Sequence, residues 1–360
     1  MGDSNIVVIG QFPPPITGFS YITDKMSAAL KQRLNVSVCN IAAPLYKNGL
    51  YKHAYRFTNT MKACMRLIAL AWRGRRVCYI ACEGGLGIIY TLLCVIVARL
   101  LGYRIYLHHH SFAYIDKPRR LMQAVLFVGG EIIHIFLCHT MCTKYQATYR
   151  RAVRSTVISN ICFVPVDEVE PLGRCDDTLV LGHLSNLTRE KGLYVFLDLL
   201  RQAISSGKSV RGVLAGPAAL EEDQAAIAAA VVEMNGKLDY RGPLYGEQKA
   251  AFYRDVDLFV FPTQYVNEAQ PTVLFEAQAA GCRVLAYDRG CIPSQVGELG
   301  LRVSPTEDFV TEALAWIDSG VVMTGRAEQK AIFNQNRAQA RAALHDLVLS
   351  AADFAPGDSQ

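Results

Sequence analysis

The sequence predicts an α/β protein of two domains, each built on a parallel β-sheet that helices cover on both faces. Three observations lead to this prediction. The 360 residues exceed the length at which a single hydrophobic core usually keeps growing. Hydrophobic residues make up 51% of the chain and charged residues 19%, which suffices for two cores. Short apolar segments rich in β-branched residues alternate with helical patterns, as is typical of parallel sheets.

The first domain is expected to cover residues 1–165. A strand at 6–9 precedes a Pro/Gly loop (QFPPPITGFS) and a helical pattern, and later strands are expected at 36–41, 77–81, 104–108 and 156–159. Segment 86–101 (LGIIYTLLCVIVARLL) contains an arginine and is shorter than the roughly 20 residues that cross a bilayer, so we expect a buried helix. Segment 121–142, after the basic KPRR, is expected to be a core helix, with a helix on a membrane surface as the alternative.

The second domain is expected to cover residues 166–345, after a linker at 164–176 that is rich in Pro, Gly and acidic residues. Residues 346–360 are expected to form a tail that could cross back to the first domain. Ligands of such sheets bind outside the carboxyl ends of the strands. The strands are expected at 179–184, 210–215, 238–241, 258–262 and 283–287, and the helices at 192–205, 218–234, 247–255 and 271–280.

The charge of the chain is unevenly distributed. Residues 1–160 carry 20 Lys and Arg against 5 Asp and Glu, whereas the remainder carries 17 against 27. The basic half suggests an anionic partner such as a phosphorylated lipid headgroup or a diphosphate-bearing acceptor, with a solvated basic surface as the alternative. Nucleic acid is not expected, because the basic residues are interleaved with apolar runs and no nucleic-acid motif accompanies them.

The stretch NEAQPTVLFEAQAAG places two carboxylates around a predicted helix start. Pro271 is expected as the first helical residue, so that Glu268 lies before the helix and Glu276 inside it. The N–H groups of Thr272 and Val273 would be unpaired donors that suit a diphosphate or a sugar hydroxyl. Each carboxylate can accept hydrogen bonds from a pair of vicinal hydroxyls, one on a ribose and one on a transferred sugar.

Two further loops and a histidine run accompany these carboxylates. In LSNLTREKG, Lys191 and Arg189 could meet a diphosphate, and in TGFS the glycine Gly18 would let the backbone approach a phosphate; a charged helix start and a plain turn are the alternatives. In the HHH run at 108–110 the first and third histidines point one way and the second the other. No metal site is expected, because adjacent histidines do not converge on one ion. The pair DD at 176–177 is expected at the surface.

Together these residues resemble the family 4 retaining glycosyltransferases over most of the chain. The resemblance rests on GQFPPPITGFS, LHHHSF, SNLTREKG, AGP, GPLYGEQKAAFYRDVDLFVFPT and NEAQPTVLFEAQAAG with CRVLAYDRG. It implies the GT-B fold, in which two Rossmann-like domains face each other across an interdomain cleft. One position departs from the family pattern, since Asn186 stands where the family commonly has an arginine five residues before the lysine. Diphosphate stabilisation would then rest on Lys191 with help from Arg189 or another basic residue.

The resemblance also implies roles for individual residues. Glu276 corresponds to the glutamate that holds the nucleotide ribose, and Glu268 to the one that contacts the donor sugar near the reacting centre. Lys191 would grip the diphosphate, and the amide of Gly18 would face the distal phosphate. A histidine of the HHH run would contact the donor sugar, His108 being preferred and His109 next. The base would lie at Leu244 and Tyr245, and the sugar and phosphate would meet the backbone of Gln270, Pro271, Thr272 and Val273.

The expected function is a retaining glycosyltransferase that moves a sugar from a nucleotide-diphosphate sugar, a UDP- or GDP-sugar, to a saccharide or polyprenyl-diphosphate-linked acceptor. This would serve bacterial surface polysaccharide or glycolipid assembly, without a cofactor or a divalent metal. The alternatives are a sugar-nucleotide 2-epimerase and a non-catalytic nucleotide-sugar-binding protein; an oxidoreductase is disfavoured because no GxGxxG follows the first strand. No secretion signal opens the chain, so a cytoplasmic location is expected, with the anionic inner face of the plasma membrane as a further contact.

Overall fold

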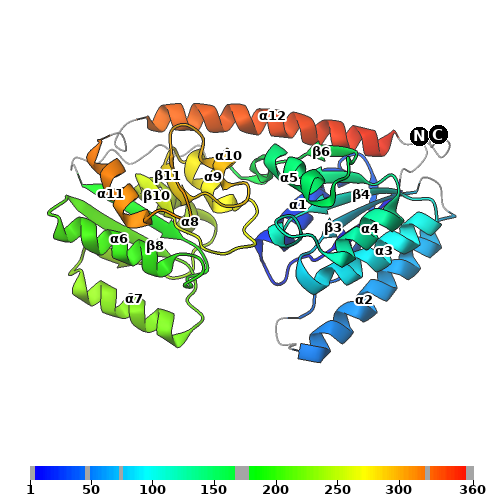
Figure 1. The fold of residues 1–360 in the computed structure, drawn as a ribbon, viewed down its shortest axis with the longest axis horizontal. Helices are drawn as coiled ribbons and strands as arrows, with labels where there is room; N and C mark the ends of the chain where they lie inside the picture. Colours follow the sequence, from blue (N-terminus) through cyan, green and yellow to red (C-terminus); the bar gives the residue numbers. More distant parts are fainter. Residues whose placement is uncertain (1–4, 45–48, 73–75, 167–177, 321–324, 354–360) are drawn as a thin grey trace. The chain divides into compact units, whose positions relative to one another are not determined.

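The computed structural model of the chain describes residues 5–44, 49–72, 76–166, 178–320 and 325–353 (Figure 1). The chain divides into two compact units, Met1–Phe163 with Gln339–Gln360, and Val164–Ala338. The predicted boundary between the two domains lies at residue 165, and the predicted boundary between the second domain and the tail lies at residue 345. Most of the predicted linker, and the acidic pair at 176–177, lie outside the described residues.

The first unit contains a six-stranded parallel sheet with the strand order β2-β1-β3-β4-β5-β6. In β1 and β3 nearly every residue is buried, as expected for strands covered on both faces, and Ile6 pairs with Val77. The carboxyl ends of all six strands therefore lie at one edge of the sheet. The strands are β1 Asn5–Gly10, β2 Asn35–Asn40, β3 Val77–Cys82, β4 Arg104–His109, β5 Ile133–Phe136 and β6 Ser155–Val157.

Helices cover both faces of this sheet. Met26 and Leu30 of α1 and Leu347 of α12 pack in one core with alternate residues of β1 and β3. In Figure 1, α2, α3 and α4 lie side by side along the unit, and the neighbouring pairs are in contact. The helix α12 begins in the second unit and ends in the first. The helices are α1 Gly18–Lys31, α2 Gly49–Leu70, α3 Ile88–Leu100, α4 Arg120–Gly129, α5 His139–Tyr149 and α12 Arg326–Ala352.

The prediction of one continuous helix over 121–142 is wrong. The segment forms all but the first residue of α4, then β5, then the start of α5. Gly130, at φ +61°, ends α4 in a conformation that favours glycine, and the run IHIF that follows is short, β-branched and aromatic. Segment 86–101 does form a helix, α3, that buries Tyr90 and Cys94 but exposes Leu100. Within the described ranges, no helix is long and apolar enough to cross a membrane.

The second unit contains another six-stranded parallel sheet, with the strand order β12-β11-β10-β7-β8-β9. Two hydrophobic clusters, one around Leu181 and Leu200 and one around Phe259 and Leu274, fill the space between the strands and the helices. The strands are β7 Leu179–Leu184, β8 Val210–Ala215, β9 Leu238–Tyr240, β10 Leu258–Phe261, β11 Arg283–Tyr287 and β12 Leu301–Val303. Three of them begin and end at the predicted residues.

The helices of the second unit follow the predicted order and extend it. They are α6 Leu193–Ser205, α7 Glu221–Glu233, α8 Gly246–Asp255, α9 Thr272–Ala279, α10 Ile292–Val296 and α11 Phe309–Asp318. The predicted helices differ from the observed ones by one to three residues at their ends. At α9 the difference bears on the site, because Pro271 is the N-cap of this helix rather than its first helical residue. Its ψ of 125° is extended, and the helix begins at Thr272. The prediction of two α/β domains with parallel sheets is confirmed.

Candidate functional site

The loop between β10 and α9, at the carboxyl end of β10, carries Glu268 in a network of polar contacts. The Lys191 ammonium lies 2.5 Å from Oε2 of Glu268, and the Thr263 hydroxyl donates to the same oxygen at 3.3 Å. Only 11% of the Glu268 side chain and 26% of the Lys191 side chain are exposed. A charge-assisted hydrogen bond in such a partly buried place holds both side chains in one position.

A second carboxylate, Glu276, is held in the same manner one turn into α9. The Lys249 ammonium lies 2.6 Å from its Oε2, and the Tyr253 hydroxyl donates to that oxygen at 2.8 Å. Burial, with a smaller contribution from the Glu276 charge, raises the pKa of Tyr253 well above its usual value, so the phenol stays a donor. Lys249 and Tyr253 are four residues apart on α8 and share one face of it.

Both glutamates keep one oxygen available. Among the contacts that the described residues make, those to Glu268 and Glu276 all fall on Oε2 and leave Oε1 without a protein donor. The first turn of α9, which presents backbone N–H groups without intrahelical partners, lies between them in sequence. The arrangement can therefore accept hydrogen bonds from a ligand's hydroxyl groups at two places and donate hydrogen bonds to its anionic group between them.

A glycine fixes the turn that carries Lys191. Gly192 has φ +91°, which favours glycine, and a Cβ there would lie 2.4 Å from the carbonyl oxygen of Pro262. The turn therefore packs directly on the backbone at the carboxyl end of β10. The Lys191 ammonium also lies 4.7 Å from the centre of the Tyr265 ring.

A second glycine fixes the loop that carries Glu268. Gly290 has φ +56°, and a Cβ there would lie 2.2 Å from the carbonyl oxygen of Glu268. The next residue, Cys291, donates its N–H to the carbonyl of Ala269 at 2.8 Å. Gln295 of α10 donates from Nε2 to the carbonyl of Pro271 at 2.9 Å. The loop after β11 thus positions both the carboxylate and the start of α9.

A buried histidine of β7, His183, is hydrogen-bonded to the loop that leads to Lys191. His183 donates from Nδ1 to the Val260 carbonyl at 2.8 Å, so its Nε2 is the nitrogen that accepts from the Ser185 hydroxyl at 2.9 Å. Burial lowers the pKa of His183 to about 4, and the nearby Lys191 charge adds to the effect. The ring is therefore neutral at pH 7 and links β7 and β10 to the loop that follows β7.

Two predicted basic or polar residues stand apart from these networks. The Arg189 guanidinium lies 4.2 Å from the centre of the Tyr194 ring, whose hydroxyl donates to Asp223 of α7 at 2.9 Å. Arg189 therefore has its described contact with Tyr194, not with the Lys191–Glu268 pair. Asn186 is exposed in the same turn.

The remaining predicted residues of this unit lie around α8 and α9. Gln270 is buried at the end of the Glu268 loop, and Thr272 and Val273 are half-buried in the first turn of α9. Leu244 packs against the hydrophobic cluster around Phe259, whereas Tyr245, the N-cap of α8, exposes 69% of its surface. An exposed aromatic ring at the start of the helix that carries Lys249 offers a stacking surface for a planar group.

In the first unit, the histidine run spreads over both faces of its sheet. His109 is fully buried, with Nε2 bonded to Nδ1 of His134 at 2.8 Å and Nδ1 to the Tyr114 hydroxyl at 3.0 Å. His108, on the other face, bonds from Nδ1 to the Tyr79 hydroxyl at 2.7 Å. Burial holds the pKa of both His108 and His109 well below the usual value. His109 has no ring nitrogen left for a ligand.

His110 lies where the strand ends, next to the first turn of α1. Its ring is 5.0 Å from that of Phe19, the neighbour of Gly18, and its Nε2 has no partner among the described residues. Burial lowers the pKa of His110 to about 3. Gly18 opens α1 behind the N-cap Thr17, and a Cβ at Gly18 would meet open space. The contacts thus bring His110, which the sequence reasoning did not prefer, beside the predicted Gly18 turn.

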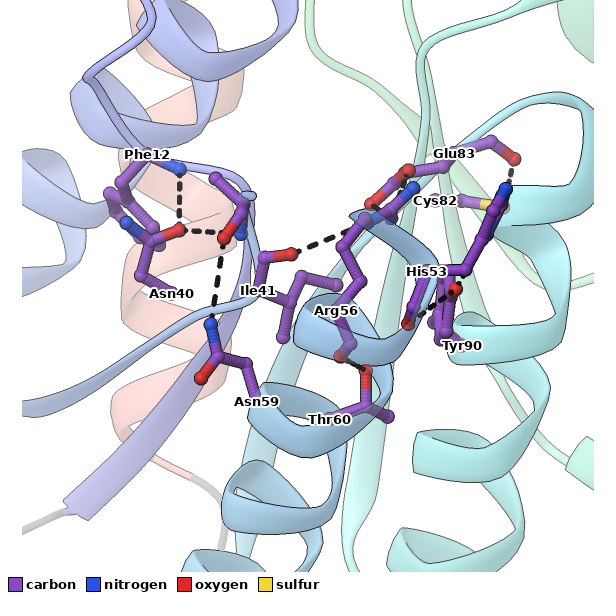
Figure 2. A network of polar contacts seen from close by, with 11 residues as sticks. Phe12, Asn40, Ile41, His53, Arg56, Asn59, Thr60, Cys82, Glu83 and Tyr90 are labelled. Carbon is purple, nitrogen blue, oxygen red and sulfur yellow. Dashed lines mark hydrogen bonds and ion pairs between the residues drawn. The ribbon is translucent and has the colours of Figure 1, made fainter. Parts of the chain in front are cut away.

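A buried ion pair marks the carboxyl end of β3. Figure 2 shows Arg56 of α2 reaching Glu83, with Nη2 2.5 Å from both carboxylate oxygens, while Arg56 Nε donates to the Ile41 carbonyl at 3.4 Å. Both side chains are less than a tenth exposed. Burial raises the pKa of Glu83, and the Arg56 charge opposes that rise. In the same view Asn40 Oδ1 accepts from the N–H of Phe12 at 3.2 Å.

Several of these residues were missed by sequence reasoning. Lys249 and Tyr253 could have been found from their spacing of four on a predicted helix next to Glu276. Arg56 and Glu83 gave no such signal, because their contact spans 27 positions and α2 itself was not predicted. Within the described ranges, no group of His, Cys, Asp and Glu side chains is arranged to hold a metal ion.

The comparisons with known proteins concern the second unit and the fold. Residues 178–319, which carry both glutamate–lysine pairs, match the family model described as glycosyl transferases group 1. The whole chain is similar in structure to Anabaena HepE, crystallised with UDP, at 16% identity and a TM-score of 0.69 over 97% of this chain and 100% of that one. A comparison with curated protein sequences returns no match.

Two further solved structures share the fold. One is the apo form of the lipopolysaccharide outer core galactosyltransferase WaaB, at 14% identity and a TM-score of 0.72 over 96% of this chain and 99% of that one. The other is sucrose-phosphate synthase from Thermosynechococcus elongatus, at 15% identity and a TM-score of 0.64 over the same shares. The two parallel six-stranded sheets with flanking helices match the GT-B fold of glycosyltransferases, which confirms the predicted fold. The second unit carries the glycosyl transferases group 1 segment, and the findings support a transferase activity.

Proposed function

We propose that the protein is a retaining glycosyltransferase that uses a nucleotide-diphosphate sugar as donor. One observation carries the proposal: Glu268 and Glu276 are each fixed by a lysine and a hydroxyl donor, and neither Oε1 receives a hydrogen bond from the described residues. The first turn of α9 lies between the two glutamates in sequence. Two hydroxyl-bearing sugars joined by a diphosphate have this pattern of donors and negative charge. Glu276 would bind the ribose, and Glu268 the transferred sugar.

In the proposed reaction, side chains and backbone amides stabilise the leaving diphosphate, without a divalent metal. The bond between the anomeric carbon and the diphosphate oxygen breaks while the acceptor oxygen forms its bond on the same face. The proton of the acceptor hydroxyl leaves with the diphosphate. The Lys191 ammonium and the amides of the first α9 turn would meet the negative charge that develops, as preorganised electrostatic stabilisation. Lys249 is a second cation within reach of this helix, and it supplements Lys191 better than Arg189, whose described contact is with Tyr194.

For the donor and the acceptor, the similar proteins guide the choice. HepE was crystallised with UDP and with UDP-glucose, and WaaB is named as a galactosyltransferase of the lipopolysaccharide outer core. We therefore expect a UDP-hexose before a GDP-sugar. The acceptor would be a saccharide or a polyprenyl-diphosphate-linked sugar at the inner face of a bacterial plasma membrane, where the excess of Lys and Arg in residues 1–160 favours anionic groups.

The test separates donor binding from transfer. Thermal shift and calorimetry with UDP-, GDP- and ADP-sugars, each with and without EDTA, would identify the nucleotide. Glu276→Gln should weaken UDP-sugar binding by roughly tenfold or more, because it removes the charged partner of a ribose hydroxyl. Glu268→Gln should lower transfer more than it lowers donor affinity. Glu222→Gln, an exposed carboxylate in the first turn of α7, is the matched control and should change neither.

Three outcomes would overturn this proposal. The first is normal binding and normal turnover in both glutamate variants. The second is donor turnover that stops when EDTA is present and returns with Mg²⁺, which would contradict the metal-independent reaction. The third is conversion of the donor to an epimerised sugar nucleotide without any acceptor, which would place the chain among the 2-epimerases.

A further inference from the structure

The inner face of α2 is firmly attached to the first unit. The buried residues of this helix include Thr60, Ala63 and Leu67, which lie on one side of it. Figure 2 shows the polar part of the attachment, in which Arg56 binds Glu83 and the Ile41 carbonyl and Asn59 approaches the Ala42 carbonyl. Because a buried ion pair and an apolar row hold one side, the rotation of α2 about its axis is fixed. Its opposite side must face outward.

An apolar stripe runs along this outward side. Its large side chains recur at intervals of three, four, seven or eight residues, which places them in one stripe along the helix and its end. In water a helix normally presents polar residues on this side. The stripe consists of Leu50 at 86% exposure, Phe57 at 49%, Met65 at 59%, Ile68 at 49% and Trp72 at 83%.

The two neighbouring helices also carry exposed apolar side chains. The helices α2, α3 and α4 contact one another in turn (Figure 1). Leu100, at the end of α3, is 81% exposed, and Phe127 of α4 is 86% exposed. Contiguous exposed apolar surface is uncommon on a monomer that meets only water, so the exposed apolar side chains of these three helices call for a partner.

Positive charge accompanies the stripe. The 22 residues of α2 contain no Asp and no Glu. Lys62 and Arg66 are exposed one turn apart beside the stripe, and Lys52 is exposed near the start of the helix. Tyr51 and Tyr55 are exposed among these basic residues, and Tyr and Trp are the side chains that favour the boundary between lipid and water.

We propose that the outward side of α2 binds the surface of an anionic lipid bilayer, with the helix axis parallel to the membrane. The stripe from Leu50 to Trp72 would enter the headgroup boundary, and Lys62 and Arg66 would meet lipid phosphates. A second copy of the chain is the less suitable occupant, because two acid-free faces would repel each other. The inference deepens the lipid-linked acceptor proposed above, but vesicle binding is measured without any donor or acceptor.

The first test uses the tryptophans, of which the chain has two. Trp316→Phe leaves Trp72 as the single tryptophan, so its emission reports on the stripe alone. With vesicles that contain 30% phosphatidylglycerol in phosphatidylcholine, we expect a blue shift and quenching by brominated acyl chains. An unshifted emission that bromine does not quench would overturn the proposal, because Trp72 would then stay in water.

The second test removes the stripe and measures vesicle flotation. Leu50→Ser with Trp72→Ser should weaken binding to the anionic vesicles by at least about tenfold. The matched control is Leu220→Ser with Val232→Ser, which removes two exposed apolar side chains at 52% and 81% exposure from the other unit. The control should float like the unchanged protein. Lys62→Gln should weaken binding mainly at low salt, where charge attraction is strongest.

Other results count against the proposal in distinguishable ways. Equal loss in both double variants, or equal binding to vesicles of phosphatidylcholine alone, would show that no specific anionic surface is recognised. Light scattering that finds a dimer in the unchanged protein and a monomer in the α2 variant, without vesicle binding, would assign the stripe to a second copy. UDP-sugar binding should persist in the α2 double variant, so a failure here is separate from a failure of the donor site.

Discussion

At the scale of the residue, each unit contains ion pairs whose two side chains hold each other in position. In the second unit, the partners of Glu268 and Glu276 come from different loops and helices, and each pair is only partly exposed. In the first unit, Arg56 and Glu83 are both almost fully buried. The energetic meaning differs: a partly exposed pair can be opened by a ligand, whereas a buried pair cannot lose one member without leaving a desolvated charge.

The buried pair leads to a stability prediction. Glu83→Gln should lower the free energy of unfolding of the first unit by about 3–5 kcal/mol, because the Arg56 charge stays buried without its partner. Arg56→Met with Glu83→Leu should cost less than the single change, since no charge is then buried. Urea unfolding followed by circular dichroism measures both.

A surface pair serves as the control for that experiment. Arg201 and Glu233 are bidentate at 2.7 and 2.8 Å, but both are nearly half exposed. Glu233→Gln should therefore leave the urea midpoint nearly unchanged, because solvent screens this pair. A loss in Glu233→Gln as large as that in Glu83→Gln would contradict the role assigned to burial.

At the scale of the element, two tight turns build the candidate site. The turn before α6 carries Lys191, and the loop before α9 carries Glu268. Gly192 allows the Lys191 turn to lie against the Pro262 carbonyl. Gly290 allows the loop after β11 to pack against the loop that carries Glu268. Without these approaches, each strand and helix could form unchanged while the lysine and the carboxylate lay apart.

A glycine substitution tests this arrangement. Gly192→Ala adds a Cβ 2.4 Å from the Pro262 carbonyl oxygen at φ +91°, so the turn must shift. We expect donor affinity to fall by about tenfold or more and stability by about 1–3 kcal/mol. Gly207→Ala is the matched control, since φ there is +76° but nothing lies within 4 Å. Gly207→Ala has the strained backbone conformation but no clash with a neighbouring atom. Equal donor affinity in Gly192→Ala and Gly207→Ala would contradict the positioning role of Gly192.

At the scale of the whole molecule, neutral buried histidines link stability to pH. Burial lowers the pKa of His110 and of His134 to about 3 and that of His183 to about 4. A lowered folded-state pKa means that the unfolded chain binds protons first as the pH falls below about 6.5. The stability contribution is therefore complete above that pH and is lost as the pH falls toward the folded-state values.

The melting temperature should accordingly decline between pH 6.5 and pH 4. For His183 alone, the difference from 6.5 to about 4 corresponds to about 3 kcal/mol over that range. His183→Asn, which cannot gain this charge, should flatten the decline of the second unit even if it lowers stability at pH 7. The control His139→Gln removes an exposed histidine and should keep the slope. An identical slope in His183→Asn would refute the linkage.

Much of the second unit could be predicted from the sequence, and less of the first. The strands at 179–184, 210–215 and 283–287 were predicted to the residue, because short apolar runs bounded by polar loops have few other structures available. The segment 121–142 misled the prediction, since a long apolar stretch hides a strand between two helices. The helix α2 went unpredicted because its apolar side chains lie on both its buried and its exposed sides, which weakens the helical pattern.

The sequence by itself determined the α/β class, the order of the strands and helices around the glutamates, and the concentration of positive charge in residues 1–160. Local pattern and composition suffice for these properties. Only the tertiary structure decided which lysine meets which glutamate, that Arg56 neutralises Glu83, and which side of α2 faces outward. These depend on contacts between residues far apart in the chain, which close packing and the burial of charge select and which no local pattern records.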